Sequence, residues 1–286
     1  MEATLFNYVV TLKCADVPGI VRAMSSSIFT MGGNILENDQ FTDPITGLFC
    51  QRTRFESKVG DVDLVLSQLT SDLADFRPTL GVRLEDHARR ALILVSKRDH
   101  CLADLLYLHE QGDLPVDIAA VASNHADCRQ LAARYEVPFH QIEFTGAAKQ
   151  SAEDELRALV ASYRVDFVVL ARFMQILSPE LCAEWSGRAI NIHHSFLPSF
   201  KGARPYQQAY ARGVKIIGAT CHFVTSDLDE GPIIEQDVVR ISHARQPRDL
   251  ESLGRDVERN VLSRTVRLIA EDRVALVGNR TIIFSQ

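Results

Sequence analysis

Short, largely apolar runs recur through the middle of this chain of 286 residues, and they constrain its fold more than any other feature. They occupy residues 91–95, 116–122, 166–170, 188–190 and 216–220. Segments with helical spacing of apolar residues separate the first three of these runs. Strands that lack a polar face must be covered on both sides. The alternation therefore predicts an α/β fold, a mostly parallel sheet with helices on both faces.

Residues 6–85 show a different order of elements. Two helical segments, which begin near Ile20 and Val62, are combined with four strand-like segments at residues 8–12, 35–42, 48–55 and 80–84. The order βαββαβ is that of a ferredoxin-like α+β unit.

A polar break at residues 86–90 separates this unit from the apolar runs. It predicts two domains, residues 1–86 and residues 87–286. We expect the second domain to end with a long helix at residues 249–270 and a closing hairpin at residues 274–284.

Composition excludes several classes of protein. With 46% hydrophobic residues the chain can bury a sizeable core, yet no apolar run approaches the roughly 20 residues of a membrane helix. The first residues lack the features of a signal peptide, so we expect a cytoplasmic location. A formal net charge of −6 does not suit a nucleic-acid-binding protein. The 6 cysteines are scattered without CxxC pairs, which predicts free, mostly buried thiols.

Polar residues follow two consecutive apolar runs. Asn191 and His193 come directly after the run that ends at residue 190, and alternate residues of a strand point to one side. A second polar cluster, residues 221–232, contains Asp229 and follows the next run. Strand ends are the usual location of chemistry in open α/β sheets. An amide, an imidazole and a carboxylate from neighbouring strand ends can carry acyl-group chemistry without a metal.

Each of these residues also has a structural interpretation. Asn191 could cap the following loop, His193 or His194 could be a buried structural histidine, and Asp229 lies in a turn composition. The pairs His193-His194 and Cys221-His222 suggest a metal, but adjacent strand residues point apart. We therefore expect no metal site.

Taken together, the motifs resemble those of the folate-dependent formyltransferase family. The resemblance rests on four segments, residues 191–193, 195–206, 222–225 and 229–234, and implies a Rossmann-like sheet. It implies that Asn191, His193 and Asp229 are catalytic, with no cofactor other than the folate substrate. It also implies a folate-contacting segment formed by Phe173, Met174, Gln175, Ile176 and Leu177. Several of these could instead be core residues, with Met174 and Leu177 equally suited to either role.

The amino-terminal unit resembles the ACT domain, through residues 16–21 and 32–35. Such domains often bind amino acids between paired copies. The resemblance implies a homo-oligomer and an effector pocket that includes Asp16, Gly19, Ile20, Asn34 and Ile35. A dimerisation module without a ligand is an equally good interpretation.

The acceptor of the formyl group depends on the first strand-to-helix loop, residues 96–101. In the ribonucleotide transformylases of the family this loop is rich in glycine and holds a phosphate, whereas here it has none. Asp99 would repel a phosphate, although Lys97 and Arg98 could attract an anion. An ACT domain followed by a formyltransferase domain is the arrangement of the 10-formyltetrahydrofolate deformylase family, which the chain resembles along its whole length.

That resemblance implies a hydrolase that converts 10-formyltetrahydrofolate to formate and tetrahydrofolate, supplying formate and balancing one-carbon pools for purine synthesis. A formyltransferase acting on an amine is the alternative enzyme. A non-enzymatic regulator that binds folate or an amino acid is the third hypothesis.

The hydrolase hypothesis assigns a role to each catalytic residue. Asn191 and His193 would donate hydrogen bonds to the oxyanion, and Asp229 would position the water and accept its proton. We expect partial burial to raise the pKa of Asp229. His222 would either orient Asp229 or only fill the strand end. Arg204 could meet a carboxylate or brace its loop.

Overall fold

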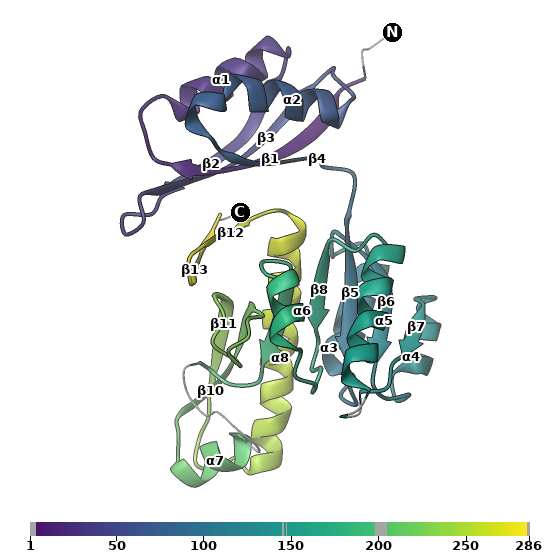
Figure 1. Cartoon of the computed structure of the whole chain (residues 1–286). Coiled ribbons are helices and arrows are strands. Elements are labelled where there is room, and N and C mark those ends of the chain that lie inside the picture. The colour runs from purple at the N-terminus through teal and green to yellow at the C-terminus, as the bar shows by residue number, and fades with distance from the viewer. Residues whose placement is uncertain (1–3, 145, 147, 198–204, 285–286) are drawn as a thin grey trace. The chain divides into compact units, whose positions relative to one another are not determined.

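The computed structural model describes residues 4–144, 146, 148–197 and 205–284. The chain forms two compact units (Figure 1). One comprises residues 1–88 together with 272–286, and the other comprises residues 89–271. The change of unit after Ala88 lies near the polar break in the sequence. The closing hairpin, however, groups with the amino-terminal unit and not with the second one, where we expected it.

The amino-terminal unit has the βαββαβ order predicted from the sequence, with one additional short 3-10 helix. Its elements are β1 Phe6–Ala15, α1 Ile20–Thr30, β2 Asn34–Thr42, β3 Leu48–Ser57, α2 Val62–Asp72, η1 Ala74–Phe76 and β4 Thr79–Leu84. The four strands form an antiparallel sheet in the order β2-β3-β1-β4. Tyr8, Phe55, Met24 and Leu69 are among the buried side chains that join both helices to the sheet.

The closing hairpin consists of β12 Val274–Val277 and β13 Arg280–Ile283. Val277 and Phe284 are buried in one cluster with Cys50 of β3. Arg280 donates two hydrogen bonds of 2.8 Å to the carboxylate of Asp43. These contacts join segments far apart in the sequence, so the order of the segments along the chain does not indicate them.

The second unit is an α/β sheet of seven strands in the order β11-β10-β9-β8-β5-β6-β7. The strands are β5 Arg89–Val95, β6 Val116–Ser123, β7 Phe139–Gln141, β8 Phe167–Leu170, β9 Ala189–His193, β10 Ile216–Phe223 and β11 Ile233–Arg240. Strands β5 to β9 are parallel, whereas β10 is antiparallel to both of its neighbours. The mostly parallel sheet predicted from the apolar runs is confirmed.

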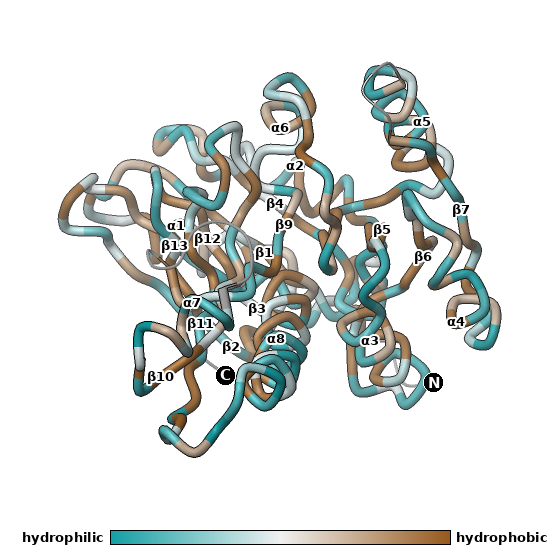
Figure 2. Tube along the Cα trace, turned by 90° about the horizontal axis from the view of Figure 1, so that it is seen from below, coloured by the Kyte–Doolittle hydropathy of each residue, from teal (hydrophilic) through white to brown (hydrophobic). Residues whose placement is uncertain are grey.

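The helices of this unit follow the predicted alternation, with one addition. They are α3 His100–Glu110, α4 Arg129–Arg134, α5 Lys149–Ser162, α6 Pro179–Glu184, α7 Pro205–Arg212 and α8 Pro247–Ala270. We did not predict α6, which is only six residues long. Helix α8 packs on β10 and β11, and Figure 2 shows it nearly end-on with hydrophobic residues gathered on one side.

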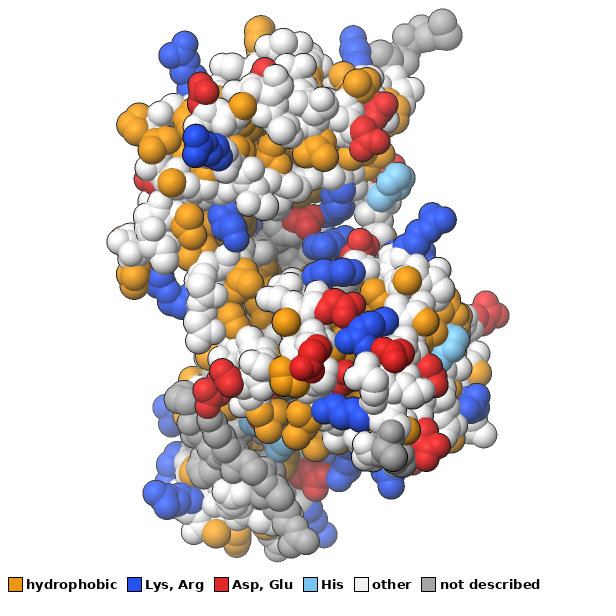
Figure 3. Space-filling view, in the orientation of Figure 1, with side chains coloured by type: hydrophobic (Ala, Val, Ile, Leu, Met, Phe, Trp, Pro, Cys, Tyr) orange, Lys and Arg blue, Asp and Glu red, His pale blue; other side chains and the backbone are white. Residues whose placement is uncertain are grey.

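The charged surface and the state of the cysteines match what the composition indicates. Basic and acidic side chains are interspersed on the visible face of the second unit (Figure 3). All 6 cysteines are free and buried, as predicted. Within the described residues, every helix is too short or too polar to cross a lipid bilayer.

Candidate active site

The polar residues of β9 and β10 face the same side of the sheet. Register places His222 directly opposite Asn191, and Thr220 directly opposite His193. Because side chains alternate along a strand, all four share one face. The adjacent Cys221 lies on the other face, where its thiol contacts Thr265 of α8. The two strands therefore bring Asn191, His193 and His222 together as neighbours.

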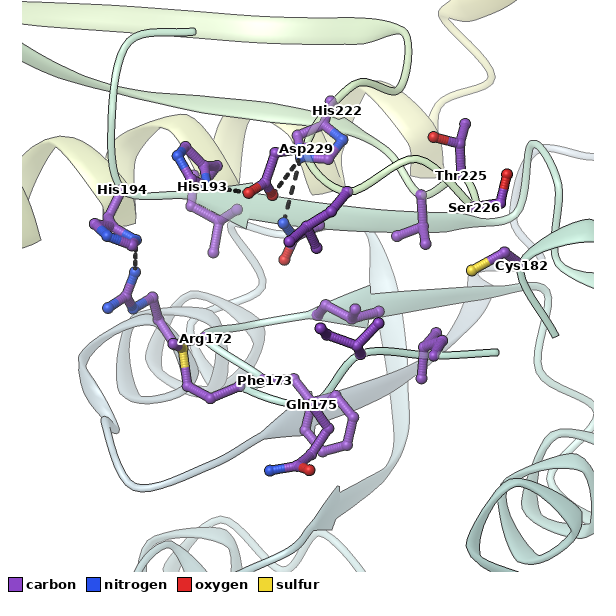
Figure 4. A pocket seen from close by; sticks show the side chains of 18 residues that line it. Arg172, Phe173, Gln175, Cys182, His193, His194, His222, Thr225, Ser226 and Asp229 are labelled. Carbon is purple, nitrogen blue, oxygen red and sulfur yellow. Dashed lines mark hydrogen bonds and ion pairs between the residues drawn. The ribbon is translucent and has the colours of Figure 1, made fainter. Parts of the chain in front are cut away.

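Asp229 reaches this group from the loop between β10 and β11 (Figure 4). Because β10 is antiparallel to β9, this loop begins beside Ala189, where the amide of Val224 donates to the Ala189 carbonyl over 2.8 Å. The chain must then turn back to bring Asp229 to His193. The turn uses left-handed backbone at Asp229, with φ of 57°. The carboxylate does not simply follow the end of a parallel strand, as the sequence had suggested.

A glycine makes this turn possible. A Cβ atom at Gly231 would lie 1.8 Å from the carbonyl oxygen of Phe223 and 3.2 Å from Nδ1 of His222. Only glycine allows the backbone to approach so closely. The returning chain is fixed there by a hydrogen bond of 2.9 Å from the Phe223 amide to the Pro232 carbonyl.

Two histidines contact the Asp229 carboxylate. Oδ2 lies 3.2 Å from Nδ1 of His193, and Oδ1 lies 3.6 Å from Nε2 of His222. His222 donates its Nδ1–H to the Phe223 carbonyl over 2.8 Å, so its Nε2 faces both Asp229 and Nδ2 of Asn191, at 3.3 Å. Nε2 of His193, whose residue is 6% exposed, has no hydrogen-bond partner among the described residues.

The pKa of Asp229 is lowered, contrary to our expectation. Burial by itself would raise the pKa, as we had argued from the sequence. The contact with Nδ1 of His193, together with the charge of His193 and His222, outweighs burial and brings the pKa of Asp229 well below its usual range. The prediction considered only burial, because the contact with both histidines is not visible in the sequence. Asp229 is therefore ionised at neutral pH.

A cavity of about 330 Å³ opens beside these residues. Its lining includes Asn191, His193, His222 and Asp229, and also the whole segment from Arg172 to Leu177. Met174 and Ile176 are 62% and 64% exposed, as apolar side chains at a cavity mouth would be. Phe173 and Leu177 are buried in the core cluster, and Gln175 is partly buried. Met174 is therefore not a core residue, whereas Leu177 both belongs to the core and lines the cavity. Contact of either residue with folate stays a prediction.

Hydrogen bonds hold the segment from Arg172 to Leu177 at Met174, near its middle, and at Ser178, directly after it. The Met174 amide donates to Oγ of Ser96, at the end of β5, over 3.0 Å. The buried carboxylate of Glu153 accepts hydrogen bonds of 2.7 Å from the Ser178 amide and 2.5 Å from the Ser178 hydroxyl. Glu153 belongs to α5, so two neighbouring elements hold the wall of the cavity in place.

The structure adds residues that we did not single out. Thr220 and Gln236 bind the loop after His193, because Leu197 donates its amide to Oγ1 of Thr220 over 3.1 Å and accepts a hydrogen bond from Nε2 of Gln236 over 3.2 Å. Arg172 and His194 also line the cavity and are hydrogen-bonded to each other. Arg172 has a φ of 63°, which is uncommon for a side chain of its size.

Other predicted residues lie elsewhere. In the amino-terminal unit Asp16, Gly19 and Asn34 are exposed and Ile35 is partly buried, whereas Ile20 is buried in the core. Arg204 lies outside the described residues. Asp99 directly precedes α3. Of the two cations in this loop, the Arg98 guanidinium is paired with Glu251 over 2.8 Å, and Lys97 is exposed.

Comparison with known proteins tests the resemblance drawn from the sequence motifs. The formyl transferase family matches residues 89–266. A formyltetrahydrofolate deformylase from Bacillus subtilis is 44% identical over 277 residues, which cover 96% of this chain and 92% of the relative. The crystal structure of a formyltetrahydrofolate deformylase from Burkholderia mallei matches with a TM-score of 0.94 and 42% identity, over 98% of this chain and 100% of that one.

A more distant structure matches part of the chain. Glycinamide ribonucleotide transformylase 1 from Symbiobacterium toebii has a TM-score of 0.66 and 31% identity, and covers 71% of this chain and 97% of that one. The resemblance drawn from the sequence motifs is confirmed. The chain belongs to the formyltetrahydrofolate deformylase family.

Proposed function

We propose that this protein hydrolyses 10-formyltetrahydrofolate to formate and tetrahydrofolate, supplying formate and balancing one-carbon pools for purine synthesis. The observation that carries the proposal is the ionised Asp229 carboxylate, held by His193 and His222 at the wall of a cavity. A protein that only bound folate would gain nothing from a carboxylate at this place. The full-length similarity to formyltetrahydrofolate deformylases supports the same substrate.

The chemistry follows from the positions of the side chains. The formyl group is amide-like, and attack by water on its carbon creates an oxyanion. Asn191 and His193 donate hydrogen bonds to that oxygen, and such donors act most strongly where water is excluded. Asp229 orients the attacking water and accepts its proton, directly or through His193. As the carbon–nitrogen bond breaks, the folate nitrogen takes up a proton, and formate leaves with the oxygen of the water.

The environment of Asp229 limits its strength as a base. A carboxylate with a lowered pKa accepts a proton weakly. The proton of the water must therefore move on as the reaction proceeds, and His193 is in direct contact for this transfer. His222 keeps its Nδ1–H on the Phe223 carbonyl, which leaves Nε2 turned towards Asp229. We assign His222 the role of holding Asp229 in orientation.

The cavity wall provides the folate site. Met174 and Ile176 offer exposed apolar surface for flat rings, and Gln175 between them offers an amide. Phe173 and Leu177 support this wall from the core. Hydrogen bonds at Met174 and Ser178 fix the segment, so the site is formed before the substrate binds.

One assay separates hydrolysis from the alternatives. The purified protein is incubated with 10-formyltetrahydrofolate, with and without a panel of added amines, and formate is measured. We expect formate at an enzyme-like rate without any amine. Turnover that requires an amine would replace the hydrolase by a formyltransferase, and tight folate binding without turnover would replace it by a regulator.

For the amino-terminal unit we propose a regulatory ACT domain that pairs two or more chains. The support is the βαββαβ order together with exposed Asp16, Gly19 and Asn34 beside the partly buried Ile35. Ile20 would support such a pocket from the core and would not touch the effector. The tests are the mass of the particle by light scattering and formate release across a panel of amino acids. A cytoplasmic location completes the proposal.

A further inference from the structure

Helix α8 carries one acidic side chain on its buried face. Glu258 is 2% exposed, in a row that also contains Gly254, Val261 and Thr265. An unpaired buried charge is strongly destabilising, so its partners must be well placed. The carboxylate forms hydrogen bonds with Nε2 of His100 and with the hydroxyl of Tyr206, both at 2.8 Å. It also forms an ion pair with Nε of Arg172 at 3.5 Å, without the geometry of a hydrogen bond.

These partners come from three separate segments of the second unit. His100 begins α3, Tyr206 lies in the first turn of α7, and Arg172 follows β8. Burial by itself would raise the pKa of Glu258, but the hydrogen bond from His100 and the charge of Arg172 lower it. Glu258 is therefore ionised, and one carboxylate joins α8 to three segments.

A glycine of α8 leaves space for the Tyr206 hydroxyl to reach Glu258. A Cβ atom at Gly254, one turn before Glu258, would lie 1.9 Å from the hydroxyl oxygen of Tyr206. A glycine inside a helix is unfavourable, so it indicates close approach of another group. The tyrosine hydroxyl occupies the space that a side chain would fill.

Arg172 continues the network towards the cavity. Its Nη1–H donates to Nδ1 of His194. Burial, with Arg172 and His193 nearby, lowers the pKa of His194 to about 4, so its ring is neutral at pH 7 and can accept this hydrogen bond. The ring of His194 lies against that of His193, with the centroids 4.9 Å apart. Contacts therefore lead without a gap from Glu258 through Arg172 and His194 to His193.

We propose that Glu258 is a positioning residue for the active site, which fixes Arg172 and thereby the His194 ring against which His193 packs. The proposal rests on the proposed hydrolysis of 10-formyltetrahydrofolate. Arg172 lines the same cavity as Asp229. Without Glu258, its guanidinium would lose its ion-pair partner there. The left-handed backbone of Arg172 would also lose a contact that holds it.

The test uses Glu258→Gln in the full-length protein, a change that keeps the size of the side chain. We expect kcat to fall by roughly 10²-fold, the size of effect that a small misplacement of a catalytic group produces, while KM for the folate stays within about twofold. The matched control is Glu251→Gln, which removes a partly exposed acid from the same helix that pairs with Arg98. Thermal unfolding of each variant is recorded alongside.

A double substitution separates positioning from general stability. If Glu258 acts through Arg172, then adding Glu258→Gln to Arg172→Met should reduce kcat by less than threefold further, because the link is already broken. Full additivity of the two losses would overturn the proposal. So would a Glu258→Gln protein with a lower melting temperature but unchanged kcat, or a wild type that binds a stoichiometric divalent metal at His100, Cys101 and Glu258. Absence of formate from the wild type would instead refute the proposed function.

Discussion

Two carboxylates of the second unit, Asp229 and Glu258, have similar partners but different surroundings. Each contacts histidine, and each has a pKa that its neighbours lower against the effect of burial. Asp229 is 17% exposed and borders the cavity, whereas Glu258 is 2% exposed and enclosed by His100, Tyr206 and Arg172. The comparison indicates that access, and not the set of partners, distinguishes the carboxylate that we propose to react from the one that we propose to fix its surroundings.

Backbone conformation supports the same distinction. Asp229 itself has left-handed backbone, as does Arg172, the arginine that Glu258 holds. Residues in such conformations persist when the surrounding structure determines them, and they gather at functional sites. In one region the left-handed backbone presents Asp229 to the cavity. In the other it presents Arg172, whose guanidinium contacts His194.

The largest effect should come from removing the charge of Asp229. We expect Asp229→Asn to lower kcat by about 10²- to 10⁴-fold, the usual contribution of a general base, and to leave folate binding largely intact. The measurements are formate release and folate binding by calorimetry. The loss should exceed that of Glu258→Gln, because in the proposed mechanism Asp229 acts on the attacking water and Glu258 acts only through Arg172.

A neighbouring aspartate provides the control for this substitution. Asp227 lies two residues earlier in the same loop and is exposed. Asp227→Asn changes the charge of the loop equally and should keep kcat within about twofold of the wild type. Turnover of Asp229→Asn at the wild-type rate would remove Asp229 from the mechanism and the comparison with it.

The second effect concerns the amide beside Asp229. Asn191→Ala should reduce kcat by roughly 10²- to 10³-fold, because it removes one hydrogen-bond donor to the oxyanion. It also leaves Nε2 of His222 without its amide partner. Formate release and folate binding are measured as before, with the exposed Asn260→Ala on α8 as the control. A loss confined to KM would show that Asn191 only binds the folate.

The sequence predicted the part of the site that depends on one strand. Asn191 and His193 share a side because they are two residues apart in β9, and this needs no knowledge of the rest of the fold. The apolar runs likewise predicted the parallel core of the sheet. The direction of β10, and hence the turn that brings Asp229 back, depends on pairing that the pattern of residues does not specify.

The network around Glu258 was missed because its members are far apart in the sequence. One signal was present: an acid among the apolar positions of the predicted helix at residues 249–270. A charge on the buried face of a helix indicates a partner in the core. Its partners, Arg172 and Tyr206, could not be named without the fold.

A smaller effect should come from the apolar part of the cavity wall, which Asp229 borders and Glu258 does not. Ile176 is 64% exposed, and a folate ring that covers it would bury apolar area at roughly 25 cal/mol per Å². We therefore expect Ile176→Ala to raise KM by about tenfold with little change in kcat. Ile216→Ala, at an exposed isoleucine outside the cavity lining, is the control. Equal KM values for the two variants would move the folate site elsewhere.

The smallest effect concerns stability at acid pH, where the two carboxylates should behave alike. A carboxyl group whose pKa is lower in the folded than in the unfolded state stabilises the fold above its unfolded pKa, which is about 3.9 for Asp and 4.3 for Glu. That stability is lost as the pH falls through the folded pKa, which for both groups is lowered.

The difference in melting temperature between the wild type and Asp229→Asn should therefore be constant above about pH 5. Below about pH 4 it should shift by a few °C, because the wild type loses stability that the variant never had. Glu258→Gln should show the same trend, measured by calorimetry from pH 7 to pH 3. A difference that stays constant for Asp229→Asn but shifts for Glu258→Gln would mean that only the enclosed carboxylate is held ionised by its neighbours, and that access to the cavity cancels the influence of the histidines on Asp229.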